Sequence, residues 1–292
     1  MSTSIWTIPL LAASATSLLG APTQSVYAVA GLTDGYYQLG SFDLANPEGT
    51  LGSYVYSWNT IGSPTPAAMA NISRQPNTGE LYLQLGFDDF QSVGTDGTTI
   101  GSTIELVDTY FGMTFGAAGL IYGLGGENNV LHTVHPTIAG EPIASLTLTP
   151  FFYSQFGGGL TATVGDQLYF ANLNYDNPNG AGELYAINPQ TNSVSLMGNL
   201  IGEDYLADDW MALFAYNANL YLLNNNRVYL VNTADASLTK LGWIENLPAE
   251  FNIGFAGAVG NVVAPVPEPS TYGLLLAGLS LALAAVRRRR VR

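Results

Sequence analysis

The sequence LYAINPQTNSVSLMG at residues 184–198 returns as VYLVNTADASLTKLG at residues 228–242, 44 residues further along the chain. In each copy an apolar residue precedes a tyrosine, an apolar residue and an asparagine follow, and a second apolar stretch ends at glycine. Short apolar runs bounded by turn-forming residues are typical of β-strands. Each copy therefore predicts a strand, a turn and a second strand.

The same kind of unit extends outward over most of the chain. Pairs of an apolar residue and tyrosine recur every 40 to 55 residues, at Val26-Tyr27, Leu81-Tyr82, Ile121-Tyr122, Leu168-Tyr169 and Leu220-Tyr221. Four short strands are predicted in the last unit, at 211–216, 219–223, 227–232 and 237–242. Earlier copies are predicted at 167–172 and 182–188, and at 120–123, 130–135 and 143–149. This period is typical of propeller blades, and the units resemble blades that read LY.I.P.T....L.G.

We therefore expect an all-β fold over residues 26–262, a β-propeller of about five four-stranded blades. The first blade would lack its opening strand, because the strand pattern begins near Val26. Residues 251–259 remain after the last unit and can supply that strand, which would close the ring and remove its open edges. The alternative is a β-sandwich in which the apolar-tyrosine pairs are coincidental.

Composition restricts the classes of partner. Of the eight basic residues, only Arg74, Arg227 and Lys240 precede the C-terminal cluster. Against 21 acidic residues before the tail, the body carries a net charge of −18. Such a field repels phosphate backbones, so we expect no nucleic-acid partner. The chain has no cysteine, which excludes disulfides and thiolate metal sites.

The N-terminal residues resemble a secretory signal. An apolar stretch rich in Leu, Ala and Ser runs from Ile5 to Leu19 and is followed by the small residues Gly20 and Ala21. We expect a signal peptide over residues 1–25. Cleavage as late as Ala28 would fit a Val-Tyr-Ala site, but the strand pattern near Val26 favours an earlier cut.

The C-terminal residues divide into three parts. Residues 263–271 form a Pro-rich linker, residues 272–286 are free of charge, and residues 287–292 are basic. A helix of 15 residues rises about 22 Å, which is shorter than the roughly 30 Å hydrocarbon core of a bilayer. We expect a short transmembrane helix that acts as a transient inner-membrane anchor. The basic cluster should stay cytoplasmic and leave the acidic body outside.

The order of these parts resembles the PEP-CTERM sorting domain of Gram-negative bacteria. The match rests on two sets of residues: the motif Val266, Pro267, Glu268, Pro269 and Ser270, and the terminal arginines Arg287, Arg288, Arg289 and Arg290. The resemblance implies recognition by an exosortase, a membrane protease, with removal of the anchor and delivery to the cell surface or extracellular matrix. It also implies an association with exopolysaccharide or biofilm. The two prolines would hold the recognised segment extended and accessible.

Histidine and glycine patterns offer little chemistry. His132 and His135 are the only histidines, and a spacing of three places them on opposite faces of a strand. We therefore expect a structural role for both rather than a zinc site. The glycines near Gly123 lack the following helix and lysine of a phosphate-binding loop.

Carboxylates and tryptophans are the remaining candidates. Asp88, Asp89, Asp208 and Asp209 are weak candidates for calcium ligands, although the spaced loop of an EF-hand is missing. Solvated surface carboxylates are the simpler interpretation. Trp58, Trp210 and Trp243 are candidate sugar-stacking residues, and we expect them more often in the core.

The leading hypothesis is a non-catalytic binding or structural protein of the cell envelope or matrix, without a cofactor. Two alternatives remain open: a secreted glycan-active hydrolase that uses paired carboxylates, and a calcium-stabilised adhesin. The hydrolase requires two carboxylates about 5 to 10 Å apart in a cleft.

Overall fold

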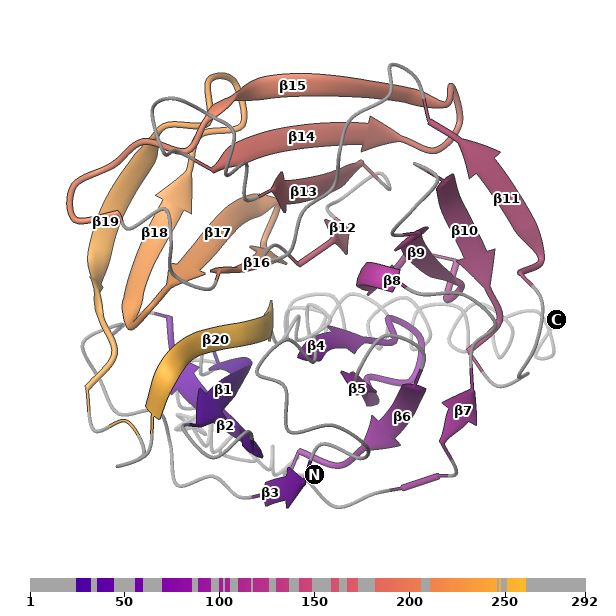
Figure 1. Cartoon of the computed structure of the whole chain (residues 1–292), viewed down its shortest axis with the longest axis horizontal. Helices are drawn as coiled ribbons and strands as arrows, with labels where there is room; N and C mark the ends of the chain where they lie inside the picture. The colour runs from indigo at the N-terminus through magenta and orange to yellow at the C-terminus, as the bar shows by residue number, and fades with distance from the viewer. Residues whose placement is uncertain are drawn as a thin grey trace, which may run out of the picture.

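The part of the chain that the computed structural model describes contains twenty β-strands, which pair in five antiparallel sheets of four. The sheets are arranged in a ring, as the blades of a β-propeller (Figure 1). The described residues are 25–32, 36–44, 56–59, 70–85, 89–95, 100–101, 103–105, 110–116, 118–125, 130–136, 142–148, 159–162, 167–172, 182–205, 211–245, 247 and 251–260.

Each blade is a meander with its first strand innermost. From the innermost strand outward, blade 1 contains β20 (Phe251–Gly260), β1 (Ser25–Leu32), β2 (Tyr36–Asp43) and β3 (Tyr56–Asn59), and blade 2 contains β4 (Ala70–Arg74), β5 (Leu81–Leu85), β6 (Asp89–Val93) and β7 (Ile104–Glu105). Blade 3 contains β8 (Tyr110–Phe115), β9 (Ile121–Gly125), β10 (Val130–Val134) and β11 (Ala144–Thr147). Blade 4 contains β12 (Thr161–Ala162), β13 (Leu168–Asn172), β14 (Glu183–Asn188) and β15 (Ser193–Asn199), and blade 5 contains β16 (Met211–Tyr216), β17 (Asn219–Asn224), β18 (Arg227–Val231) and β19 (Leu238–Trp243).

The strand predictions for the last three blades are confirmed, and the β-sandwich alternative is wrong. The closing strand is also where the sequence places it: β20 pairs antiparallel with β1, so the two ends of the described chain complete one blade. All five apolar-tyrosine pairs lie on the second strand of a blade, namely β1, β5, β9, β13 and β17. The repeat in the sequence is therefore the repeat of one structural position.

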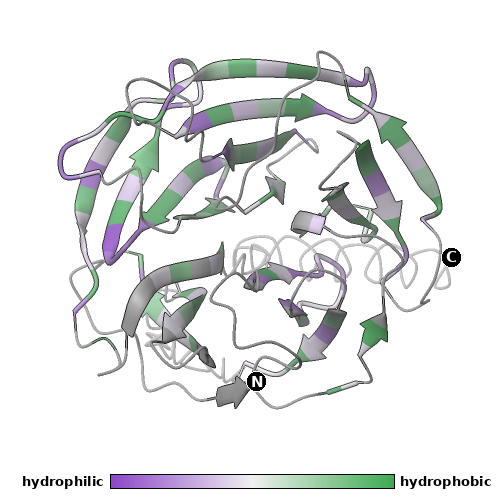
Figure 2. Cartoon of the chain, viewed as in Figure 1, coloured by the Kyte–Doolittle hydropathy of each residue, from purple (hydrophilic) through white to green (hydrophobic). Residues whose placement is uncertain are grey.

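The core is divided among the five interfaces between blades. One buried cluster lies at each interface, and hydrophobic segments recur along the strands of the last two blades (Figure 2). Each second strand faces two interfaces, so neighbouring residues on it are buried on opposite sides. Leu220 belongs to the interface of blades 4 and 5, whereas Tyr221 belongs to that of blades 5 and 1. This double burial explains why the pattern is a pair of apolar residues rather than an alternation.

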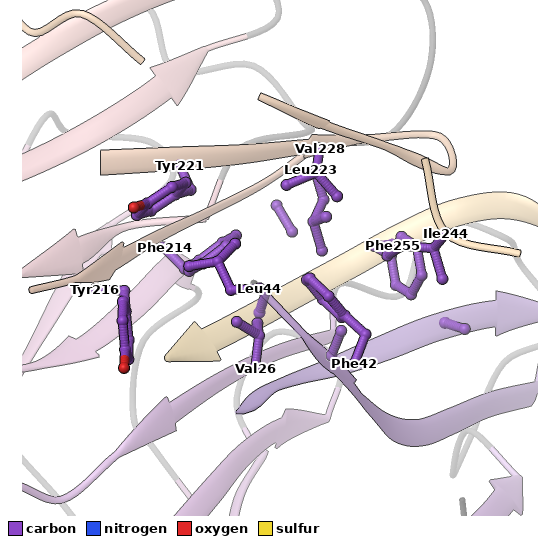
Figure 3. Close-up of a cluster of buried hydrophobic side chains, with 14 residues drawn as sticks. Val26, Phe42, Leu44, Phe214, Tyr216, Tyr221, Leu223, Val228, Ile244 and Phe255 are labelled. Atoms are coloured by element: carbon purple, nitrogen blue, oxygen red, sulfur yellow. The ribbon is translucent and has the colours of Figure 1, made fainter. Parts of the chain in front are cut away.

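The interface between blades 5 and 1 includes the closing strand. Phe255 of β20 is fully buried there, and the Phe214 and Tyr221 rings stack with centroids 5.2 Å apart (Figure 3). Val26 and Phe42 reach this cluster from blade 1. Burial of a large apolar side chain contributes roughly 1.5–3 kcal/mol, so this cluster holds the first and last strands together.

The repeated asparagine helps to form the turn in both of the last two blades. The Asn188 Oδ1 atom accepts hydrogen bonds from the backbone N–H groups of Gln190 and Thr191, and Asn232 accepts one from Ala234 in the same way. Such side-chain contacts replace part of a backbone turn. The repeated glycines, Gly198 and Gly242, follow a β-bulge at the same place in both blades.

Candidate functional site

The chain leaves the ring beside the point where it enters. Gly260, the last residue of β20, pairs with Val26 near the start of β1. A Cβ atom on Gly260 would lie 2.7 Å from Cδ2 of Tyr216, which ends β16. The C-terminal exit is therefore fixed by two neighbouring strands and lies next to the axis of the ring.

The innermost strands pack closely around that axis. A Cβ atom on Gly257 would lie 2.7 Å from the backbone nitrogen of Ile72, and one on Gly112 would lie 2.6 Å from that of Leu160. Real Cβ atoms do not approach so closely, and so glycine allows the backbones of neighbouring blades to meet. At these two positions the backbones of neighbouring innermost strands are in direct contact.

Asn71 is one of the buried polar residues on the innermost strands. It is buried on β4, its Nδ2 group donates a 3.0 Å hydrogen bond to the carbonyl of Met113 on β8, and its Oδ1 atom accepts from the N–H of Ile72. It therefore links the innermost strands of blades 2 and 3. This role could not be predicted from the sequence, because a single asparagine in a short strand belongs to no pattern.

The outer edge of blade 5 carries a group of charged and aromatic side chains. Lys240 forms an ion pair with Asp204, which lies on the segment that follows β15, and its Nζ atom is 5.7 Å from the Trp243 ring centroid. The Trp243 Nε1–H group donates a 3.1 Å hydrogen bond to the Glu245 carboxylate. We call these four residues the blade-5 corner. The expectation of a core position is wrong for Trp243, which is 40% exposed.

The electrostatics of this corner follow from its ion pair. The Lys240 ammonium group donates a hydrogen bond to Asp204 and holds the pKa of that carboxyl below its ordinary value. Nearby, burial raises the pKa of Tyr229 to about 12, although the positive charge of Arg227 opposes that increase. The Tyr229 hydroxyl donates to the backbone carbonyl of Glu203, 3.0 Å away. The corner thus joins an indole ring to two carboxyl groups and a lysine side chain.

The two histidines lie on or next to one strand and do not form a metal site with other described residues. His132 lies on β10, its Nδ1 atom is 2.8 Å from the Ser145 hydroxyl, and its ring meets Tyr110 edge-to-face with centroids 5.6 Å apart. His135 follows the end of the same strand. Within the described ranges, no group of three or more His, Asp or Glu side chains could hold a metal ion.

Most of the carboxylate candidates lie outside the described residues. This holds for Asp88, Asp208 and Asp209, and for Trp58 and Trp210 the side chains are likewise not described. Asp89 begins β6 and pairs along the backbone with Leu85 and Glu105. Calcium binding and paired-carboxylate catalysis stay hypotheses that these positions do not test.

The sorting residues, the apolar segment 272–286, the arginines and residues 1–24 of the signal segment also lie outside the described residues, whereas Ser25, the last residue of that predicted segment, begins β1. In the parts of the chain with described structure, no helix has the length and apolarity needed to cross a membrane.

Comparison with known families identifies the tail. The model of the PEP-CTERM protein-sorting motif matches residues 265–290. The chain carries a PEP-CTERM sorting motif. The match begins after only four residues beyond Gly260, so the PEP-CTERM tail follows the closing strand almost directly. Residues 266–270 and 287–290, which sequence analysis assigned to this motif, fall within the match. No curated protein sequence is similar enough to count as a relative.

Solved structures resemble the propeller body only distantly. Virginiamycin B lyase from Staphylococcus aureus is 13% identical, with 76% of this chain and 71% of the lyase covered and a TM-score of 0.40. A protein of unknown function from Bacteroides caccae is 10% identical, with 82% and 98% covered and a TM-score of 0.42. Glutaminyl cyclase from Myxococcus xanthus is 14% identical, with 66% and 71% covered and a TM-score of 0.38. Likenesses this weak carry no argument about the activity of this chain.

Proposed function

We propose that this protein is exported, anchored briefly in the inner membrane, cleaved by an exosortase, and then retained as a non-catalytic component of an exopolysaccharide matrix. The observation that carries the proposal is the sorting motif at residues 265–290, which begins five residues after the last residue of a propeller's closing strand. The motif indicates an exosortase-targeted surface protein. The matrix role and the lack of catalysis go further and are inferred from the body.

Two features of the body support a structural or binding role. Neighbouring innermost strands are in direct backbone contact at Gly112 and Gly257, which holds blade 3 against blade 4 and blade 1 against blade 2. Stability without disulfides depends on the five buried clusters between the blades. Arranging the blades in a ring leaves only short, protected strand edges, which suits a protein that must persist outside the cell.

The blade-5 corner supports a saccharide as the partner. An exposed indole offers a large apolar face, and carboxylates and an ammonium group beside it can bond to sugar hydroxyls. Trp243 and Glu245 are joined by a hydrogen bond, which fixes the orientation of the ring. A neutral polysaccharide also avoids repulsion by the acidic body, whereas an anionic one would not.

The proposal is tested by changing the recognised carboxylate in the native host. The Glu268→Ala variant should accumulate as a precursor in the inner-membrane fraction, because the proline-flanked carboxylate is the part of the segment that an exosortase would recognise. Asn261→Ala, which lies before the matched residues, should mature normally. Normal maturation of Glu268→Ala would contradict the role given to the motif.

A further inference from the structure

The chain leaves the propeller from a defined face of the ring. The ends of the innermost strands lie on one side: Gly260 at the end of β20 is against Tyr216 at the end of β16, and the Ala162 N–H group at the end of β12 donates to Thr114 of β8. The innermost strands therefore run in the same direction. β1 starts at this side too, because Val26 pairs with Gly260.

This side is bordered by the turns that connect first and second strands. They include the turn closed by the hydrogen bond from Gly79 to Gln75, the turn closed by that from Gly119 to Gly116, and the hairpin at Asn217. We call it the exit face. The β17–β18 turn lies on the opposite side of blade 5, where the Ile244 N–H group donates a hydrogen bond to the carbonyl of Asn226. The exposed Glu245 directly follows Ile244 on that side.

We propose that, while the sorting tail is in the membrane, the exit face is the surface that lies against the bilayer and the opposite face is presented outward. The inference rests on the proposed membrane-anchored precursor. It adds an orientation, which the sorting motif itself does not specify.

The length of chain between the ring and the apolar segment supports this orientation. Twelve residues lead from Gly260 to Tyr272, and at full extension they span about 40 Å. Suppose instead that the opposite face lay against the bilayer. Because β20 is the innermost of four strands, the linker would first have to cross the blade outward over three strand spacings, about 14 Å. It would then run down the height of a six-residue strand, about 20 Å. Only about 6 Å of the extended linker would then remain to reach the apolar segment.

An inverted ring would also hide the recognised segment. Pro267, Glu268 and Pro269 lie seven to nine residues beyond Gly260 and would then run along the side of the propeller, away from the membrane-embedded protease. With the exit face towards the bilayer, the same residues lie between ring and membrane. Two turns on this face, at Gly116–Leu120 and Asn217–Ala218, carry no charge, whereas the β18–β19 turn on the same side carries the exposed Asp235. The orientation therefore rests on the length of the linker and on access to the recognised segment, and not on charge.

The absence of native cysteine allows a direct test by site-specific labelling. Full-length Thr78→Cys and Ala118→Cys carry a fluorophore on the exit face, and Glu245→Cys carries it on the opposite face; all three parent residues are exposed. The labelled chains are reconstituted in phosphatidylethanolamine and phosphatidylglycerol vesicles that contain a nitroxide-headgroup lipid and no exosortase. Circular dichroism melting confirms folding of each variant.

Both exit-face labels should be quenched several-fold more strongly than the label at position 245. Equal quenching, as from a ring resting on its rim, or stronger quenching at position 245 would overturn the orientation while leaving the anchor intact. Failure of the full-length chain to float with vesicles would contradict the anchor, and the orientation with it. When proteolysis releases residues 25–260 from the vesicles, the difference in quenching between the exit-face labels and the label at position 245 should disappear.

Discussion

Val26, near the start of the first strand, pairs with Gly260, the last residue of the last strand. The first blade is thus built from both ends of the body, and the ring cannot close until β20 is available. Contacts between residues so distant in sequence form late and slowly. The strand that completes the fold is also the one that the sorting tail follows in the sequence.

Gly257 tests the closure directly. A Cβ atom there would lie 2.7 Å from the backbone nitrogen of Ile72 and 2.8 Å from Cα of Asn71, neither of which can move alone. Gly257→Ala should lower the free energy of unfolding by about 1–3 kcal/mol, measured by urea denaturation. Gly101→Ala, which meets only the Ser92 hydroxyl, is the control. Equal stability of the two variants would mean that β20 does not pack as described.

Ala218 occupies a left-handed backbone conformation in the hairpin between β16 and β17, with φ of 63°. Glycine adopts this conformation without the Cβ penalty, so Ala218→Gly should raise the free energy of unfolding by about 0.5–1 kcal/mol. Ala236 has φ of 61°, but its side chain is fully buried between blades 4 and 5. Ala236→Gly should therefore gain less or lose stability. Thermal melts that rank the two variants the other way would contradict this turn geometry.

Tyr229 predicts a loss of stability at alkaline pH. Its pKa is raised to about 12 in the folded protein, so folding favours the protonated phenol. This stabilisation is complete below the ordinary tyrosine pKa of about 10 and is lost as pH rises through about 12. Tyr229→Phe should lose about 1 kcal/mol at pH 7 through the missing bond to Glu203, and decline less above pH 10. Denaturation curves at pH 8 and pH 11 measure both effects; parallel declines would show that Tyr229 does not contribute.

Trp243 is the residue on which the proposed saccharide contact depends. Trp243→Ala should weaken retention of the soluble body on host exopolysaccharide about tenfold, which corresponds to about 1.4 kcal/mol. Trp243→Phe keeps an aromatic face and should retain most of the binding. If the alanine variant binds as the parent does, the blade-5 corner is not the binding surface.

The repeat could be predicted from the sequence because its residues have periodic roles. Leu220 and Tyr221 face different interfaces, and Asn188 and Asn232 form equivalent turns. Residues with the same structural role are therefore of the same type in the copies that contain them. The closing strand could be predicted by elimination, because the first blade lacked its opening strand and one apolar segment remained after the last blade.

The blade-5 corner could not be predicted in this way. Asp204 and Lys240 are 36 residues apart and meet only because blades 4 and 5 are neighbours in the ring. Trp243 was expected in the core, as aromatic residues of an all-β body usually are, but it lies on an outermost strand with no blade outside it. Asn71 and Gly257 likewise owe their roles to the convergence of the innermost strands, which single-sequence patterns do not record.

The central claim is that a closed propeller is released from its anchor within the sorting motif. Intact-mass analysis of the protein from the native host's surface and matrix fraction tests this claim most directly. We predict a mass that lacks the residues beyond Pro267-Glu268-Pro269, including the apolar segment and the terminal arginines. A full-length mass, with the protein held in the inner membrane, would contradict it.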